Sequence, residues 1–382
     1  MKLHHLILKL AFKAFSGREG PRIPLDRSRV KSILVMTTTA IGDTAMSTPA
    51  IRAVRRNFPN ARVTALVSVA AREVLSGNAC VDAFIKYPGR INLGYLLKLP
   101  WFLKELKAGS FDLVIALHSN DPDAGPIAYM TKAPWRIGPA ESGFAFLFTN
   151  PVRMKSPGTH FVDARLKNLS ALGIAPHGRH MDFFLDEEDL LEARAFLSDN
   201  GIKDERLITL HPFGSKRNKW WPLVHTGTFS ALAKVAGFTT VVLGGPREAK
   251  AAEASALPAG AVSAAGRLSL RGSAALISLS DAIVTTDSGL MHLAQALRTP
   301  TIALFGPDDP EVSGPVNNES VVMTAALPCA PCRSKACALP QNDCMRGILP
   351  EEVLQRVLDS IRTGRQKTAK VIHFRNPKKA QR

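Results

Sequence analysis

The 382-residue sequence lacks several signals that would place it directly in a class of proteins. No stretch of about 18 consecutive apolar residues exists, so no membrane-spanning helix is expected. The apolar stretch near the N-terminus is not followed by the small-residue cleavage site of a signal peptide, which argues against export. No GxGxxG fingerprint follows any expected strand, which argues against a nicotinamide or flavin enzyme. With 46% hydrophobic and 21% charged residues, the chain is expected to fold, and its length suits two domains.

Acidic residues are scarce at both ends of the chain. Residues 1–31 hold eight Lys and Arg against Glu19 and Asp26, and residues 362–382 hold eight and no acid. Of the net charge of +17, about +3 is left for the 330 residues between them. Basic appendages on a nearly neutral body favour attraction to an anionic surface over a basic groove in the fold. Because no nucleic-acid motif is recognised either, no nucleic-acid partner is expected.

The N-terminal residues have the pattern of a basic amphipathic helix. Apolar residues at positions 3, 6, 7, 10, 11 and 14 fall at helical spacing, with Lys2, Lys9 and Lys13 between them, and Phe12 and Phe15 widen the apolar side. Such a helix can lie in a membrane interface. Alternatively, it packs on its own domain.

Expected strands and helices alternate along the rest of the chain. The strands cover 32–36, 62–67, 82–85 and 111–117 in the first half, and 207–211, 239–243, 261–263, 281–286 and 301–305 in the second. This alternation predicts an α/β protein with parallel sheets flanked by helices on both faces. We expect an extension and linker at 1–30, domains at 31–178 and 179–362, and a basic tail at 363–382. Two similar halves predict a cleft between the carboxyl ends of two sheets.

One strand–turn–helix segment has the features of an anion site. After the strand at 281–286, Asp287, Ser288 and Gly289 open a helix whose free N–H groups point out of the carboxyl end of the strand. The small residues let a phosphate reach the backbone, and Asp287 offers a carboxylate beside it. Alternatively, Asp287 is only the N-cap of the helix.

Three other loops carry candidate residues. Gly42 follows the first strand and presents Asp43 at the edge of the sheet, although Asp43 could instead cap a helical turn. The loop 211–222 combines Ser215, three cations that include Lys219, and two tryptophans, which suits the binding of a diphosphate or a sugar phosphate. Alternatively, it is a solvated basic loop, although such loops rarely carry Trp-Trp-Pro. Glu248 could accept hydrogen bonds from a ribose, or complement a helix dipole.

Four of the five cysteines are close in sequence: Cys329, Cys332, Cys337 and Cys344. Their spacing is typical of a small metal site, and in a reducing compartment zinc or an iron–sulfur cluster suits it better than disulfides do. Alternatively, the segment is a local structural clip. A catalytic role for a metal there is not expected.

The ordered set of motifs resembles the glycosyltransferase family 9 of ADP-heptose-dependent lipopolysaccharide heptosyltransferases. The set comprises Gly42-Asp43, Pro49, Lys219-x-Trp-Pro, Gly244-Gly245-Pro246, Asp287-Ser-Gly-x-Met-His-Leu-Ala294 and Phe305-Gly-Pro-x-x-Pro310, over roughly residues 31–362. The resemblance implies a GT-B fold, in which two Rossmann-like domains face each other across a cleft, and inversion at the anomeric carbon. No cofactor is then expected to be required for catalysis.

The resemblance also implies roles for individual residues. Asp43 would be the general base, Ser215 and Lys219 would contact the donor phosphates, and Glu248 would contact the adenosine ribose. The backbone N–H groups of Ser288 and Gly289 would hold the diphosphate, with Asp287 near the donor sugar.

The family pattern further implies an anionic core glycolipid as acceptor and a place on the cytoplasmic face of the inner membrane. This sequence differs from the family pattern at two places. Thr37-Thr38-Thr39 stands where a basic residue is frequent in the family, which leaves the identity of the acceptor open, and Trp220 stands where a polar residue is commoner. A sugar-nucleotide epimerase of similar build is the alternative enzyme, and it would need neither an acceptor nor basic ends.

Overall fold

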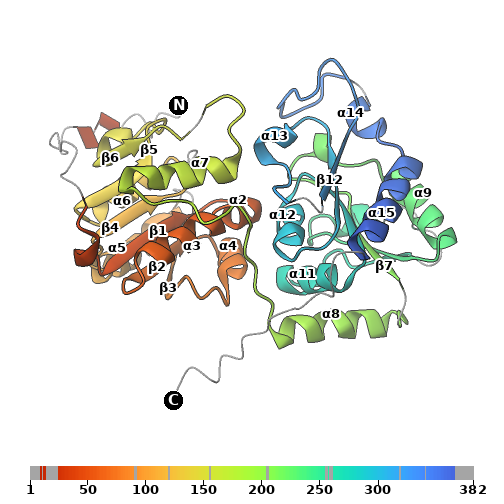
Figure 1. The fold of residues 1–382 in the computed structure, drawn as a ribbon, viewed down its shortest axis with the longest axis horizontal. Helices are drawn as coiled ribbons and strands as arrows, with labels where there is room; N and C mark the ends of the chain where they lie inside the picture. The colour runs from red at the N-terminus through yellow and green to blue at the C-terminus, as the bar shows by residue number, and fades with distance from the viewer. Residues whose placement is uncertain are drawn as a thin grey trace. The chain divides into compact units, whose positions relative to one another are not determined.

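The computed structural model describes residues 9–10, 12–13, 25–89, 93–118, 121–154, 156–203, 206–253, 257, 261–317, 320–339 and 341–365. The chain divides into two compact units, Met1–Arg179 and His180–Arg382, one residue from the boundary expected at 178/179 (Figure 1). Within the described residues, no helix combines the length and the apolar character that crossing a membrane requires.

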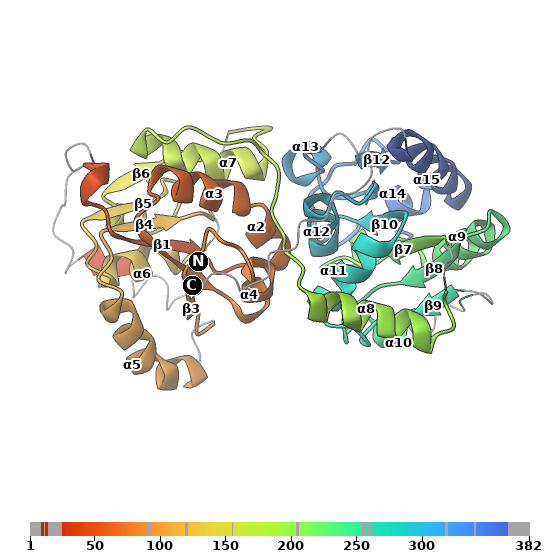
Figure 2. The same ribbon diagram turned by 60° about the horizontal axis from the view of Figure 1, so that its bottom comes forward.

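The first unit is a parallel sheet of six strands in the order β3-β2-β1-β4-β5-β6. The strands are β1 (Ser32–Thr37), β2 (Arg62–Val67), β3 (Ala83–Lys86), β4 (Leu113–Ala116), β5 (Trp135–Pro139) and β6 (Asn150–Val152). The helices are α2 (Ile41–Ala45), α3 (Thr48–Asn57), α4 (Val69–Leu75), α5 (Leu93–Ala108), α6 (Ala124–Met130) and α7 (Phe161–Asn168). Figure 2 shows α3 and α7 on one face of the sheet and α5 and α6 on the other.

The second unit is also a parallel sheet of six strands, in the order β12-β11-β10-β7-β8-β9. Its strands are β7 (Leu207–His211), β8 (Thr239–Val242), β9 (Ala261–Ser263), β10 (Ala282–Thr286), β11 (Thr301–Phe305) and β12 (Ser320–Thr324). Its helices are α8 (Glu187–Asp199), α9 (Leu223–Val235), α10 (Ala249–Glu253), α11 (Leu270–Leu279), α12 (Gly289–Ala296), α13 (Pro310–Ser313), α14 (Asp343–Arg346) and α15 (Pro350–Arg365). In Figure 1, α11 and α12 lie on one face of this sheet and α9 and α15 on the other.

Both units therefore have the same strand order when their strands are counted from β1 and from β7. The inner strands are buried on both faces, since every residue of β7, β10 and β11 is buried and only Ser32 of β1 is partly accessible. In a doubly wound sheet of this order, ligands bind where the order reverses, at the carboxyl ends of the two central strands. These points lie between β1 and β4 in the first unit and between β7 and β10 in the second. The predicted α/β class with parallel sheets is confirmed.

Several element boundaries and strands differ from the predictions. Helix α3 takes Ser47 as its N-cap, and the hydroxyl of the following Thr48 donates to the carbonyl of Ala45 at 2.7 Å. Strands β5, β6 and β12 were not predicted from the sequence. β5 and β6 are interrupted by glycine or proline, and β12 is a half-exposed strand at the edge of its sheet.

The expected N-terminal helix lies largely outside the described residues. Within this segment the structure describes residues 9–10 and 12–13, and these are helical. The ring of Phe12 makes edge contacts with Tyr129, at a centroid distance of 5.9 Å, and with Phe144, at 6.2 Å. The Lys13 ammonium lies 5.9 Å from the ring centroid of Phe146. At Phe12 the structure therefore supports packing on the helix's own domain. Residues 366–382 of the basic tail also lie outside the described residues.

Candidate functional site

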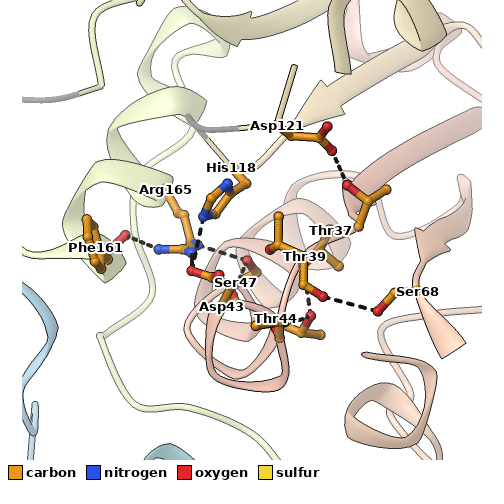
Figure 3. Close-up of polar contacts among 12 residues, drawn as sticks. Thr37, Thr39, Asp43, Thr44, Ser47, Ser68, His118, Asp121, Phe161 and Arg165 are labelled. Atoms are coloured by element: carbon orange, nitrogen blue, oxygen red, sulfur yellow. Dashed lines mark hydrogen bonds and ion pairs between the residues drawn. The ribbon is translucent and has the colours of Figure 1, made fainter. Parts of the chain in front are cut away.

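In the first unit, three side chains meet at the point where the strand order reverses. Asp43 lies on α2, directly after β1; His118 follows β4, and Arg165 lies on α7. Oδ1 of Asp43 is 2.8 Å from Nη2 of Arg165 and 3.1 Å from Nε2 of His118. Figure 3 shows both side chains converging on the carboxylate.

Arg165 is held rigidly while it contacts Asp43. Its side chain is 3% exposed, Nε donates to Ser47 Oγ at 2.9 Å, and Nη1 donates to the carbonyl of Phe161 at 2.8 Å. Ser47 in turn donates to the backbone carbonyl of Asp43 at 2.8 Å. These bonds connect α7 to α2 and fix the orientation of the Asp43 carboxylate. The alternative that Asp43 only caps a helical turn is wrong, because the N-cap of α2 is Ala40.

The neighbours of Asp43 keep it ionised. Burial alone would raise the pKa of this carboxyl, but the hydrogen bond and charge of His118 and the charge of Arg165 outweigh it and hold the pKa well below its usual range. Both contacts fall on Oδ1, and among the described residues Oδ2 has no hydrogen-bond partner. The side chain is 22% exposed. An ionised carboxylate oxygen is therefore available to a hydroxyl group.

A second carboxyl group lies near this cluster and was not singled out from the sequence. Asp121 is buried, accepts a hydrogen bond from the Thr38 hydroxyl, and accepts another from the Asp123 N–H at 3.0 Å. Burial raises the pKa of Asp121 above its usual value. Thr38 follows β1 and Asp121 follows β4, so this pair also lies at the reversal of the strand order.

In the second unit, a lysine lies between two carboxylates at the corresponding point. Lys219 ends a short 3₁₀ helix, Arg217–Lys219, in the loop after β7. Its Nζ lies 2.7 Å from Oδ2 of Asp287, which follows β10, and also contacts Oδ2 of Asp308, which follows β11. The three side chains are 11%, 13% and 20% exposed, respectively. Lys219 and Asp287 were singled out from the sequence as separate candidates; Asp308 was not.

The structure corrects the alternative interpretation of Asp287 as a helix cap. The N-cap of α12 is Ser288, and its hydroxyl does not cap the helix either. Instead, the Ser288 hydroxyl lies 3.1 Å from Nδ1 of His211 and 3.2 Å from the Thr285 hydroxyl. The first N–H groups of α12 thus have no side-chain cap, which leaves a helix N-terminus suited to an anion. Burial lowers the pKa of His211 to about 4, so the imidazole is neutral at physiological pH.

The loop that carries Lys219 is packed closely on itself. A Cβ atom on Gly214 would lie 2.7 Å from Cβ of Lys219, so glycine is needed for this approach. Trp220 donates from Nε1 to the carbonyl of Gly214 at 2.9 Å, and Trp221 donates to the carbonyl of Ile348 at 3.0 Å. The two indoles therefore hold the loop in shape, a role that the sequence did not distinguish from ligand contact.

Ser215 and Glu248 lie on neighbouring loops of the same sheet edge. Ser215 is exposed in the loop after β7. Glu248 precedes α10, and its Oε2 accepts a hydrogen bond from the Gly245 N–H at 2.9 Å. The backbone after β8 is therefore closed onto the Glu248 carboxylate. The proposed contacts of these two residues with a donor stay predictions.

The four clustered cysteines are free thiols. Burial raises the pKa of Cys344, and the nearby Cys337, Cys332 and Cys329 raise it further, which indicates that the four lie in one neighbourhood. However, in the part of the chain that the structure describes, no three His, Cys, Asp or Glu side chains are placed to hold a metal ion. The hypothesis of a metal site therefore gains no support from this geometry and stays a prediction.

Comparisons with known proteins agree with these observations. Residues 101–342 match the model of "Glycosyltransferase family 9 (heptosyltransferase)". Lipopolysaccharide heptosyltransferase 1 of Pseudomonas aeruginosa is 30% identical over 318 residues, which cover 80% of this chain and 87% of that protein.

Two solved structures share the fold. A family 9 glycosyl transferase from Veillonella parvula has a TM-score of 0.78 at 23% identity, covering 87% of this chain and 97% of that one. The ADP-heptose lipopolysaccharide heptosyltransferase II of Escherichia coli has a TM-score of 0.72 at 19% identity, covering 87% and 99%. Each unit has the parallel sheet of a GT-B enzyme. The match to the family model, together with the Pseudomonas aeruginosa relative, shows that the chain belongs to glycosyltransferase family 9, a family of heptosyltransferases.

Proposed function

We propose that this glycosyltransferase moves a heptose from ADP-heptose to the core oligosaccharide of lipopolysaccharide, with inversion at the anomeric carbon. The observation that carries the proposal is the presence of complementary sites, one in each unit. One unit offers an ionised carboxylate with an open oxygen at Asp43. The other offers a lysine beside an uncapped helix N-terminus, at Lys219 and α12. The names of several relatives support the choice of sugar, and that of the E. coli enzyme includes ADP-heptose.

In the proposed reaction, Asp43 acts on the acceptor. Oδ2 of Asp43 accepts the proton of the attacking hydroxyl, while the oxygen of that hydroxyl forms the new bond to the anomeric carbon. Positioned proton transfer of this kind contributes about 10²–10⁴-fold to rate. Arg165 and His118 stay bonded to Oδ1, which keeps the other oxygen aimed at the acceptor.

The second unit acts on the leaving group. As the anomeric carbon–oxygen bond breaks, its electron pair goes to the β-phosphate, which leaves as ADP. The N–H groups at the start of α12 and the Lys219 ammonium stabilise this negative charge without having to reorganise. Asp287, bonded to Lys219, lies where the donor sugar is expected, and Ser215 and Glu248 complete the contacts to phosphate and ribose.

The proposed acceptor is an anionic glycolipid at the cytoplasmic face of the inner membrane. The basic segments at residues 1–31 and 362–382 supply positive charge for such a surface. Co-sedimentation with vesicles of anionic and of neutral lipid tests this part. Equal binding to both kinds of vesicle, or none to either, would contradict it.

The decisive experiment measures nucleoside diphosphate release with a panel of sugar nucleotides and truncated lipopolysaccharide acceptors. We expect ADP release from ADP-heptose only when an acceptor is present. Net release without any acceptor would favour a hydrolase, and conversion of the sugar nucleotide into its epimer would favour an epimerase. Mass spectrometry of the glycolipid then identifies the sugar that was added.

The metal hypothesis for the four cysteines is tested separately from transfer. Stoichiometric zinc or iron in protein purified without chelators would support a metal that orders the segment 329–344. Its absence would leave the segment as a structural clip. No catalytic step depends on this outcome.

A further inference from the structure

Asp308 is a carboxylate at the donor side that neither the sequence motifs nor the proposed mechanism uses. Its Oδ2 contacts the Lys219 ammonium, which also bonds Asp287. A lysine has three N–H donors, and two protein carboxylates here accept from them. The cation proposed to bind the donor's diphosphate is thus already neutralised from two sides.

Asp308 is placed by a well-built loop rather than by chance at the surface. The carbonyl of the preceding Pro307 accepts a hydrogen bond from the Arg333 N–H at 2.6 Å. The following Asp309 caps α13 through the Glu311 N–H at 2.9 Å and contacts the Arg333 guanidinium. Both neighbours of Asp308 are therefore fixed, so the carboxylate is held towards Lys219.

The charge on Asp308 is present at neutral pH. Burial would raise the pKa of this carboxyl, but the hydrogen bond and charge of Lys219 outweigh it, and Lys216 acts in the same direction. Asp287, the other carboxyl on Lys219, has its pKa raised by burial. A diphosphate therefore approaches a site in which the negative charge of the two carboxyl groups equals or exceeds the single positive charge of Lys219.

Asp308 is the carboxylate better placed to leave Lys219. Asp287 directly precedes Ser288 at the start of α12, at the end of a fully buried strand. Asp308 lies in the loop before α13 and is the more exposed of the two, at 20% against 13%. An anion bound at the N-terminus of α12 would lie next to Asp287. We therefore expect the anion to replace the Asp308 carboxylate, rather than that of Asp287, as a partner of Lys219.

We propose that Asp308 is an internal competitor of the donor's diphosphate for Lys219. It holds the lysine while the site is empty, gives it up when the diphosphate binds, and takes it back as the nucleoside diphosphate leaves. Asp308 thereby weakens nucleotide binding and speeds product release. This inference rests on the proposed function, because it takes Lys219 as the phosphate-binding cation.

The test compares ADP binding by titration calorimetry in the full-length protein and its variants. Asp308→Asn removes the charge and keeps the shape. We expect ADP to bind about tenfold more tightly, a change of about 1.4 kcal/mol, and ADP to become a stronger product inhibitor by a similar factor. Asp309→Asn is the matched control, because asparagine still caps a helix and Asp309 contacts Arg333 rather than Lys219. We expect the control to change the Kd less than twofold.

The outcomes separate this inference from the proposed function. If the wild type does not bind ADP, or if Lys219→Gln binds it as tightly as the wild type does, the proposed function is wrong at the donor side. If Lys219→Gln weakens binding but Asp308→Asn binds ADP equally or less tightly, Asp308 positions the lysine and the competition is wrong. Asp308→Ser provides a second neutral variant, and a thermal melt of each variant confirms that it is folded.

Discussion

Arg165 and Asp43 form a largely buried ion pair, with Nη2 of the guanidinium 2.8 Å from Oδ1 of the carboxylate. The pair connects a helix late in the first unit to the turn that follows its first strand. It explains how a carboxylate can be presented in one orientation and remain charged. Its consequences for activity can be measured.

Replacing Asp43 tests its proposed role as the base. Asp43→Asn keeps the size of the side chain and removes the negative charge, so transfer should fall by about 10²–10⁴-fold while ADP binding changes little. Initial rates of glycolipid formation and calorimetry with ADP measure the two effects. Asp163→Asn is the control, because Asp163 forms an exposed ion pair with Arg179. Wild-type turnover in Asp43→Asn would remove Asp43 from the mechanism.

Replacing Arg165 should alter the pH dependence of transfer. A base must be deprotonated, so activity falls as the pH drops through its pKa, and in the wild type that pKa lies well below the usual range. Arg165→Gln removes a charge that lowers this pKa, so the acidic fall in kcat/KM should move to higher pH. Arg165→Lys should restore part of the shift. An unchanged pH profile in a folded Arg165→Gln protein would show that the ion pair does not control the base.

The close packing at Gly214 predicts a specific loss at the donor side. In Gly214→Ala the new Cβ would meet Cβ of Lys219 at 2.7 Å, so the lysine loop must shift. A displacement of this kind should lower kcat/KM for the donor by about 10–100-fold. Gly143→Ala is the matched control, because a Cβ there meets no atom within 4 Å. Donor kinetics equal to those of the control would contradict the proposed placement of Lys219.

The buried His211 predicts a loss of stability in mild acid. Its pKa is about 4 in the folded chain, against 6.5 for the unperturbed group. Between these values the unfolded chain binds a proton that the folded chain does not, so the free energy of unfolding falls as the pH drops. At about 1.4 kcal/mol per pH unit, the loss is on the order of 3 kcal/mol. Urea unfolding at pH 4.5 and pH 7 measures it.

His211→Gln provides the comparison for this measurement. The variant lacks the titrating group, so its unfolding free energy should depend less on pH across the same range. If the two proteins lose stability in parallel between pH 7 and pH 4.5, the proton linkage does not arise from His211. The absolute stability of the variant does not enter the comparison.

The sequence was most informative where structure depends on local pattern. The buried strands β2, β7 and β11 have the predicted bounds, because continuous apolar and β-branched residues between turns leave little choice. The edge strands β6 and β12 were missed because they are short or half exposed, so their pairing depends on the neighbouring strand rather than on their own composition.

The candidate sites show the same limit. Asp43, Lys219 and Asp287 stood out because each follows a strand with unusual neighbours. Arg165, by contrast, lies in an ordinary helix, His118 lies outside the recognised motifs, and Asp308 is an unspecified position of the motif Phe305-Gly-Pro-x-x-Pro310. His118 and Asp308 reach the sites because β4 lies beside β1 and β11 beside β10, which the order of residues alone does not reveal. Arg165 reaches Asp43 from α7, much later in the chain. Had this order been assumed, the polar residues after β4 and β11 would have been candidates.

The shared strand order of the two units bears on how such an enzyme diversifies. Each half has candidate side chains after its first and fourth strands, namely Asp43 and His118 in the first unit and Lys219 and Asp287 in the second. Under the proposed division of roles, new acceptors would be acquired by changes near Asp43 alone, while the machinery for the activated sugar is inherited intact. Chimaeras that exchange only residues 38–43 and 118–123 between family members would reveal whether acceptor choice is transplantable in this way.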